Sequence, residues 1–155
     1  MSFSVLGKEV MVEGINHLSS VDSKIKHLLN SFDVPDLKVE KNYFWSLCRA
    51  IIYQQISGKA AKTIADRFLV LFSSNINIKP LEVLSMDINK LYGVGLSRQK
   101  AGYIKNIAEA FEKKIIDDKI IIKYNNDDII EMLTQIKGVG RWTAEMFLIF
   151  TLRRS

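Results

Sequence analysis

The chain has 155 residues, of which 48% are hydrophobic, and its formal net charge is +5. This size indicates one soluble domain or the larger part of one, and no apolar stretch is long enough to cross a bilayer. The single cysteine, Cys48, excludes an intrachain disulfide and a cysteine-rich zinc or iron–sulfur site built from these residues alone. The first residues lack the order of a secretory signal, so an intracellular location is expected.

Apolar residues recur at helical spacing along most of the chain, and only two prolines interrupt the pattern. The pattern predicts an all-α bundle, with an N-terminal segment and first helix over 1–40 and the main helical domain over 41–155. Cys48 lies on one predicted inner face and is interpreted as a core residue, the alternative being a reactive thiol. The predicted inner faces are, in chain order, Ile25, Leu28, Leu29 and Phe32, ended before Pro35; Phe44, Leu47, Cys48, Ile51 and Ile52; Ala61, Ile64, Ala65, Phe68 and Phe72; and Ala101, Ile104, Ala108 and Phe111.

Capping residues indicate where further helices begin, because short polar side chains satisfy the first free amides of a helix and proline fits its first turn. The isoleucine-rich segment 115–122 has the composition of a strand, but a lone strand would have nothing to pair with. We therefore expect a helix tail and a loop there. The predicted N-caps or first residues are Ser57, Pro80, Asp87, Ser97 and either Asp127 or Asp128.

The segment 133–152 carries the most informative pattern. An amphipathic run ends in Gly138-Val139-Gly140, and a very apolar run begins at once. This predicts two helices joined by a tight glycine turn, a helix-hairpin-helix. The amides that open the second helix point outward with the positive end of its dipole, which makes a site for an anion such as a phosphate. Arg141 and Thr143 supply further donors beside it.

A second Gly-Val-Gly occurs at 93–95, also between two predicted helices. It is followed by Ala101 much as the later turn is followed by Ala144. One interpretation is a second phosphate site. The other is that Gly-x-Gly is simply a common way to join two helices, and the sequence leaves both open.

Three segments in register resemble one protein family. They are 53–61 (YQQISGKAA), 95–101 (GLSRQKA) and 138–147 (GVGRWTAEMF). In this order and spacing they resemble the helix-hairpin-helix DNA glycosylases, specifically the alkyl-base branch of 3-methyladenine DNA glycosylase II. The resemblance covers roughly residues 18–152. It implies base excision repair in the cytoplasm or nucleoid, with alkylated purines released from double-stranded DNA by base flipping and hydrolysis, without an organic cofactor.

The resemblance implies specific DNA contacts. The hairpin of this family grips the DNA backbone through main-chain amides, often with a bound Na⁺ or K⁺, which here falls to the backbone of Gly138 and Gly140. For Arg98 and Lys100, the alternative to a phosphate contact is that they are solvated surface charges. The expected backbone contacts are Gly138, Val139, Gly140, Thr143, Arg98 and Lys100.

The loop after the second helix of the family inserts a side chain into the gap left by the flipped base. Gln55 matches this position, with Gln54 beside it. We expect Gln55 to continue the Cys48 and Ile52 face beyond the core; the alternative is that it caps the end of its own helix.

The base pocket is expected at Trp142 and Met146, for which core packing is the alternative. Lyase-capable members of the superfamily carry a nucleophilic lysine where this chain has Trp142. Tryptophan cannot form a Schiff base but can stack on a flipped base, so water is the expected nucleophile.

The family also carries a catalytic aspartate beyond the second hairpin helix, and no aspartate follows Gly140 in this sequence. We expect that residue, and helices covering the apolar segment 144–150, to lie beyond Ser155, so that the sequence is a truncated product or a fragment. If the chain is complete, its C-terminal helix should self-associate. Two other functions therefore stay open: a non-catalytic DNA-binding protein or fragment, and a helical interaction domain with incidental basic charge.

Overall fold

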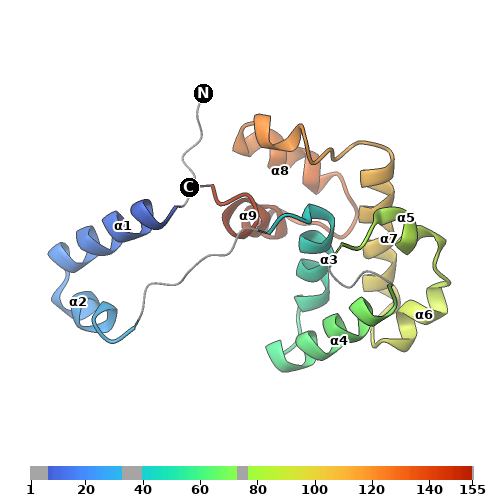
Figure 1. The fold of residues 1–155 in the computed structure, drawn as a ribbon, viewed down its shortest axis with the longest axis horizontal. Coiled ribbons are helices and arrows are strands. Elements are labelled where there is room, and N and C mark those ends of the chain that lie inside the picture. The colour runs from blue at the N-terminus through green and yellow to red at the C-terminus, as the bar shows by residue number, and fades with distance from the viewer. Residues whose placement is uncertain (1–6, 33–39, 73–76, 155) are drawn as a thin grey trace.

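The computed structural model describes residues 7–32, 40–72 and 77–154, and the described elements are helices only, which confirms the all-α prediction (Figure 1). A short 3₁₀ helix, η1, covers Ile121–Lys123. The α-helices are α1 (Lys8–Val21), α2 (Ser23–Leu29), α3 (Tyr43–Tyr53), α4 (Gly58–Val70), α5 (Pro80–Ser85), α6 (Ile88–Gly93), α7 (Arg98–Glu112), α8 (Asn126–Thr134) and α9 (Arg141–Phe150).

Most predicted helix starts are confirmed. Ser57 caps α4 and Ser97 caps α7, each through its hydroxyl on an amide of the first turn. Pro80 is the first residue of α5, and the Asp87 carboxylate caps α6. These helix starts depend on local contacts, since each capping side chain bonds an amide only two or three residues away.

The start of α8 differs from the prediction. Its N-cap is Asn125, whose side-chain oxygen accepts a hydrogen bond from the Asp128 amide at 2.8 Å. Asp127 and Asp128 lie in the first turn instead, where their negative charge is favourable beside the positive end of the helix. In the segment 115–122 the expected loop is present and there is no strand, but the expected helix tail is not, because α7 already ends at Glu112 and the segment forms turns and the start of η1.

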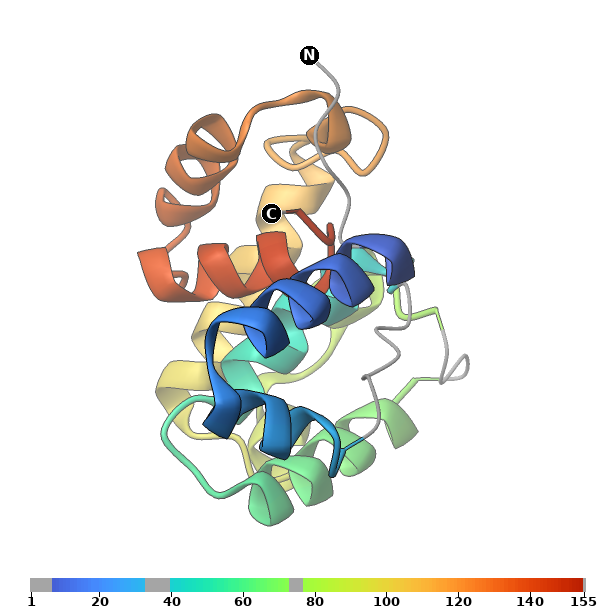
Figure 2. The ribbon, with the colours of Figure 1, turned by 90° about the vertical axis from the view of Figure 1, so that its left-hand side faces the viewer.

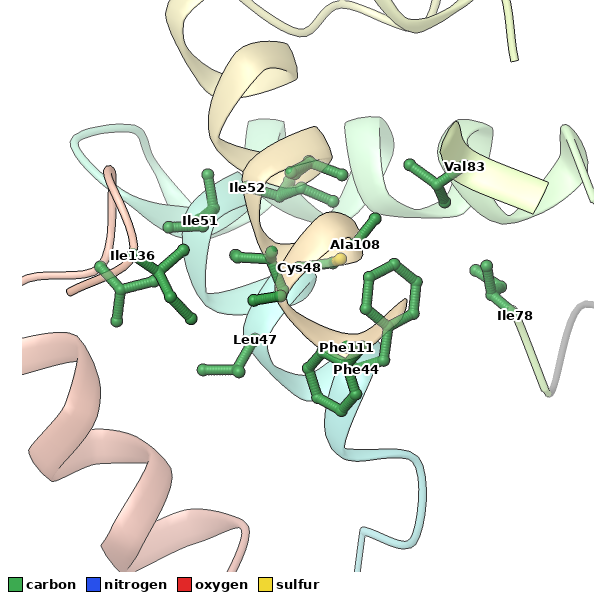
Figure 3. Packing of buried hydrophobic residues seen from close by; sticks show 14 of the residues in the cluster. Phe44, Leu47, Cys48, Ile51, Ile52, Ile78, Val83, Ala108, Phe111 and Ile136 are labelled. Atoms are coloured by element: carbon green, nitrogen blue, oxygen red, sulfur yellow. The ribbon is translucent and has the colours of Figure 1, made fainter. Parts of the chain in front are cut away.

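The core is built around α3 and α7 (Figure 3). Phe44 and Phe111 meet edge to face with ring centroids 5.5 Å apart. Cys48 is fully buried, and burial raises the pKa of its thiol well above the usual range, so its interpretation as a core residue is confirmed. The buried residues of α3 are Phe44, Ser46, Leu47, Cys48, Ile51 and Ile52.

The first predicted inner face is not buried. Ile25 and Leu29 are half-buried, while Leu28 and Phe32 are 57% and 73% exposed. The reason is that α2 packs mainly on α1. Figure 1 shows this pair to one side of the other helices, and in Figure 2 the pair lies in front of them. The predicted end before Pro35 and the interpretation of the first six residues lie outside the described residues.

The described helices include none that is long and apolar enough to span a membrane. At the C-terminal end, α8 and α9 pack on each other across the turn at 135–140, and α9 also contacts α3 (Figure 2). The predicted hairpin is thus present, and it is held against the central helix of the core. The proposed division of the chain at residue 40 stays a prediction.

Candidate nucleic-acid interface

The glycine turn lies at the surface. Gly138 has a φ of 109°, a conformation that residues with a Cβ avoid, and it is half-buried, whereas Gly140 is exposed. Val139 between them is 4% exposed, and its amide donates to the Ile136 carbonyl at 2.9 Å. The Val139 amide, which we expected to contact DNA, is therefore already used inside the turn.

The start of α9 has the features of an anion site. Its first intrahelical bond runs from the Ala144 amide to the Gly140 carbonyl at 3.0 Å, so the amides of Arg141, Trp142 and Thr143 have no carbonyl within the helix. Gly140 is the N-cap, and in the described part of the chain no side chain caps this helix. The free amides and the positive end of the dipole are thus available to a phosphate.

The turn at 93–95 also contains one left-handed glycine, but this is the second glycine of its Gly-x-Gly, whereas at 138–140 it is the first. Its left-handed glycine is Gly95, with a φ of 104°, and this corresponds to Gly138 rather than to Gly140. One buried residue follows each of these glycines, and the helix N-cap comes next, Ser97 in one turn and Gly140 in the other.

This register separates the two turns chemically. The Ser97 hydroxyl accepts from the Lys100 amide at 3.2 Å, so the first turn satisfies its own helix start. Gly140, at the matching position, leaves α9 uncapped. The comparison favours the plain helix-joining interpretation for 93–95 and keeps the phosphate interpretation for 138–140.

Lys100 lies beside the loop that follows α3. Its ammonium donates to the main-chain carbonyls of Ile52 at 2.8 Å and Gln54 at 2.6 Å. Partial burial lowers its pKa. Lys100 therefore caps the end of α3 from another helix. One N–H of its ammonium is left for a phosphate, and that contact stays a prediction.

Gln55 is exposed and has a φ of 55°, in the left-handed region. The helix before it ends at Tyr53 and Gln54 is extended, so Gln55 does not continue the Cys48 and Ile52 face, contrary to our expectation. Its side chain makes no described hydrogen bond to the end of its own helix, where Lys100 bonds the carbonyls of Ile52 and Gln54. Its side chain is presented on a separate loop.

Gln54 turns toward the hairpin instead. Its side-chain amide donates to the Thr143 hydroxyl at 3.3 Å, and both residues are shielded, Thr143 being 3% exposed. This bond joins the Gln55 loop directly to α9. Of the two glutamines expected to enter the DNA, Gln55 is the exposed one, and the insertion roles of both stay predictions.

An apolar cavity of about 640 Å³ opens between α3 and α9. Trp142 borders it and is 65% exposed, which excludes the alternative that it is an ordinary core residue. Met146 borders it one turn further along and is half-buried. The floor carries two buried hydroxyls, Ser46 and Thr151, which are hydrogen-bonded to each other. The cavity thus combines flat and soft apolar walls with a few polar side chains, a combination typical of small-molecule sites.

A second, polar cavity of about 460 Å³ lies on the other side of the same loop, between the start of α7 and the hairpin. Gln54, Gln55 and Gly140 line both cavities. They form the boundary between the apolar cavity and the hairpin surface. The exposed loop is therefore next to both the expected base pocket and the expected phosphate site.

The expected Na⁺ or K⁺ would have main-chain oxygens as ligands. Oxygen donors suit such an ion, although the Gly140 carbonyl already accepts the first bond of α9. The described residues hold no cluster of three His, Cys, Asp or Glu side chains that suits a metal. The hairpin cation stays a prediction.

The remaining predicted features lie on the surface. Arg98 is exposed at the start of α7, where its phosphate contact stays a prediction. On α9, Phe147 and Leu148 are buried, whereas Phe150 is 53% exposed. The uncovered apolar surface expected over 144–150 is thus largely limited to Phe150, because Ala144, Phe147 and Leu148 are buried, and self-association through the C-terminal helix stays a prediction.

Sequence reasoning missed several residues of this interface. Tyr103 and Asn106 on α7 contact the hairpin, Asn106 through a 3.0 Å bond from its amide to the Lys137 carbonyl. Tyr53 and Arg49 line the apolar cavity. Tyr53 stands directly before the glutamines that the resemblance singled out, which was the one signal available.

Comparisons with known proteins agree with this geometry. The family model described as "HhH-GPD superfamily base excision DNA repair protein" matches residues 48–146. The chain is 36% identical to DNA-3-methyladenine glycosylase 1 of Schizosaccharomyces pombe, over 99% of this chain and 71% of that protein. The family match begins inside α3 and ends inside α9, and it includes the Gln55 loop, α7 and the glycine turn.

Two solved structures share the fold. One is the 3-methyladenine DNA glycosylase of Schizosaccharomyces pombe in complex with abasic DNA, with a TM-score of 0.84 and 36% identity over 90% of this chain and 70% of that one. The other is a DNA-3-methyladenine glycosidase from Bacillus halodurans, with a TM-score of 0.74 and 31% identity over 98% of this chain and 68% of that one. The hairpin, the loop at Gln55 and these matches together show that the chain belongs to the HhH-GPD superfamily of base excision DNA repair proteins.

Proposed function

We propose that this chain binds double-stranded DNA at alkylated purines and supplies the DNA grip and base pocket of a monofunctional N-glycosylase. The observation that carries the proposal is the position of Trp142. Its exposed indole borders the apolar cavity and its amide belongs to the uncapped start of α9. One helix end thus combines a phosphate site with a stacking surface for a flipped base.

The chemistry of a base pocket fits these groups. A base stacked on an aromatic side chain gains about 1–3 kcal/mol, and an alkylated, electron-poor base should gain more for the reason that cations favour indole faces. The Ser46 and Thr151 hydroxyls add a polar contact at the floor. Unstacking is easiest at damaged pairs, which contributes to selectivity.

The type of reaction follows from Trp142. An indole offers no amine for a Schiff base, so we infer hydrolysis of the N-glycosidic bond by water with the abasic strand left uncut. The relatives named for 3-methyladenine glycosylase activity support alkylated purines as the substrate class.

A second candidate is DNA binding without base release. It is favoured by one observation, that among the described residues no aspartate or glutamate lines either cavity. Such a protein would still use the hairpin and the Gln55 loop.

One experiment separates the two candidates. The chain is incubated with methylated duplex DNA, and free base, strand cleavage and binding are measured together. Release of alkylated purines with an intact abasic strand supports the glycosylase, whereas selective binding of the damaged duplex without release supports the second candidate. Equal, weak binding of damaged and undamaged duplexes without release would contradict both.

A further inference from the structure

The ammonium of Lys100 donates hydrogen bonds to the main-chain carbonyls of the two residues that flank Tyr53. The two carbonyls that accept from its ammonium, at 2.8 and 2.6 Å, belong to Ile52 and Gln54. The last carbonyls of a helix have no amide partner within the helix, and a lysine can supply the missing donor. Here the lysine comes from α7, 46 residues away from Gln54 in the sequence.

The residue that follows these carbonyls is Gln55, in the left-handed conformation. A residue with a Cβ keeps this conformation only where its surroundings hold it. Two contacts hold the loop here: Lys100 on the main chain before Gln55, and the Gln54 amide on Thr143 of the hairpin helix. The position of Gln55 relative to α9 thus depends on contacts made by its neighbours.

We propose that Lys100 is a positioning residue, which holds the loop so that Gln55 enters DNA at the distance set by the hairpin. The proposal rests on the proposed function, because it takes insertion of Gln55 as given. It assigns Lys100 to the protein backbone, since two of its three N–H donors bond carbonyls. A residue that acts only through a phosphate would have its donors directed to solvent.

The same helix offers a matched control. Lys105 donates to the carbonyls of Leu84 at 3.2 Å and Met86 at 2.8 Å, which close the end of α5. It makes the same kind of contact as Lys100, with a loop that borders neither cavity. Lys100→Met and Lys105→Met both keep the aliphatic stem and remove the ammonium, but only Lys100→Met releases the loop between the two cavities.

The test compares affinity for a duplex carrying an abasic-site analogue with affinity for the undamaged duplex, in the wild type, Lys100→Met, Lys105→Met and Gln55→Ala. A 2-aminopurine beside the abasic site reports insertion by its fluorescence. Lys100→Met should lose roughly tenfold or more of the preference for abasic DNA, because misplacing a contact group by about 1 Å costs up to about a hundredfold. Gln55→Ala should lose a similar part of the preference for abasic DNA. The fluorescence change should disappear in Lys100→Met and in Gln55→Ala. Lys105→Met should behave as the wild type.

Two results would overturn the assignment. If Lys100→Met weakens binding of both duplexes alike and lowers the salt slope by about one, Lys100 is a phosphate contact. If it matches Lys105→Met, the loop does not need it. Failure of the proposed function is distinguishable, since the wild type would then show no preference for abasic DNA and Gln55→Ala would change nothing.

A measurement on the wild type covers the case in which Lys100→Met does not fold. Lysine acylation is followed residue by residue with mass spectrometry. Lys100 and Lys105, whose ammonium groups are bonded to carbonyls, should react more slowly than the exposed Lys59 and Lys137. A Lys100 that reacts as fast as Lys59 would contradict the proposal.

Discussion

Tyr103 fills the space that a side chain on Gly138 would need. A Cβ built on Gly138 would lie 2.6 Å from the Tyr103 Cβ and closer still to the ring. The ring is held in turn by Gln99, whose amide donates to the Tyr103 hydroxyl at 2.5 Å. One face of α7 therefore supports the hairpin, and it specifies glycine at 138 by packing as well as by φ.

Gly138→Ala should destabilise the fold. The left-handed backbone and the overlap with Tyr103 together cost on the order of 2–4 kcal/mol. Urea denaturation measures the loss. Gly140→Ala is the control, because its Cβ would meet no described atom within 4 Å and its φ is −88°, so it should cost less than about 1 kcal/mol. Equal losses in the two variants would contradict the packing argument.

Gly140→Asp should change stability and DNA affinity in opposite directions. A carboxylate at the N-cap would satisfy the free amides of α9 and face the positive end of the dipole, a gain of about 0.5–1 kcal/mol. The same carboxylate would occupy the phosphate site and repel DNA. Gly140→Asn, a cap of the same shape without charge, separates blocking from repulsion. If Gly140→Asp bound undamaged duplex as tightly as the wild type, phosphate would not bind at this helix start.

Trp142→Ala should leave the fold almost unchanged, because the side chain is 65% exposed, while it removes stacking of about 1–3 kcal/mol on a flipped base. Phe147→Ala is the matched contrast on the same helix. Phe147 is 3% exposed and meets Tyr43 edge to face at 5.8 Å, so its loss should cost about 3–5 kcal/mol of unfolding free energy. A Trp142→Ala variant as unstable as Phe147→Ala would indicate a structural role for the indole.

Arg154→Met should destabilise the C-terminal half. Arg154 is 5% exposed, and its guanidinium donates to the carbonyls of Tyr124 at 2.6 Å and Ile122 at 2.7 Å, which fixes the segment before α8. Bonds to a charged donor contribute about 1.5–3 kcal/mol, so thermal unfolding should shift down clearly. Arg98→Met, at an exposed position, should stay within about 0.5 kcal/mol of the wild type. Matching melting temperatures for the two variants would refute this role.

Local chemistry and periodicity were readable from the sequence. Ser57 and Ser97 could be assigned as caps because their partners lie within the next turn. The inner face of α3 could be assigned because buried residues repeat every three to four positions. The glycine turn at 138–140 followed from Gly-Val-Gly between two helical runs, whereas the loop at Gln55 followed from the resemblance of three segments in register.

Contacts between distant segments were not readable. Lys100 was expected to contact a phosphate, with solvated surface charge as the alternative, since nothing near it in the sequence indicates the Ile52 and Gln54 carbonyls. The pattern of α2 required a partner for its apolar face but did not say how much of that face α1 would cover, and Phe32 stays exposed. The two Gly-x-Gly turns look aligned as letters, and only φ shows that Gly95 matches Gly138.

The uncapped start of α9 is the place where we expect the DNA backbone to bind. Backbone amide chemical shifts of the ¹⁵N-labelled protein, followed during titration with an undamaged duplex at low salt, report on this contact residue by residue. We expect the amide signals of Arg141, Trp142 and Thr143 to move most, and those at the Ser97-capped start of α7 to move less. If saturating DNA left those three amide signals unmoved and shifted resonances elsewhere, the DNA backbone would not bind at the start of α9.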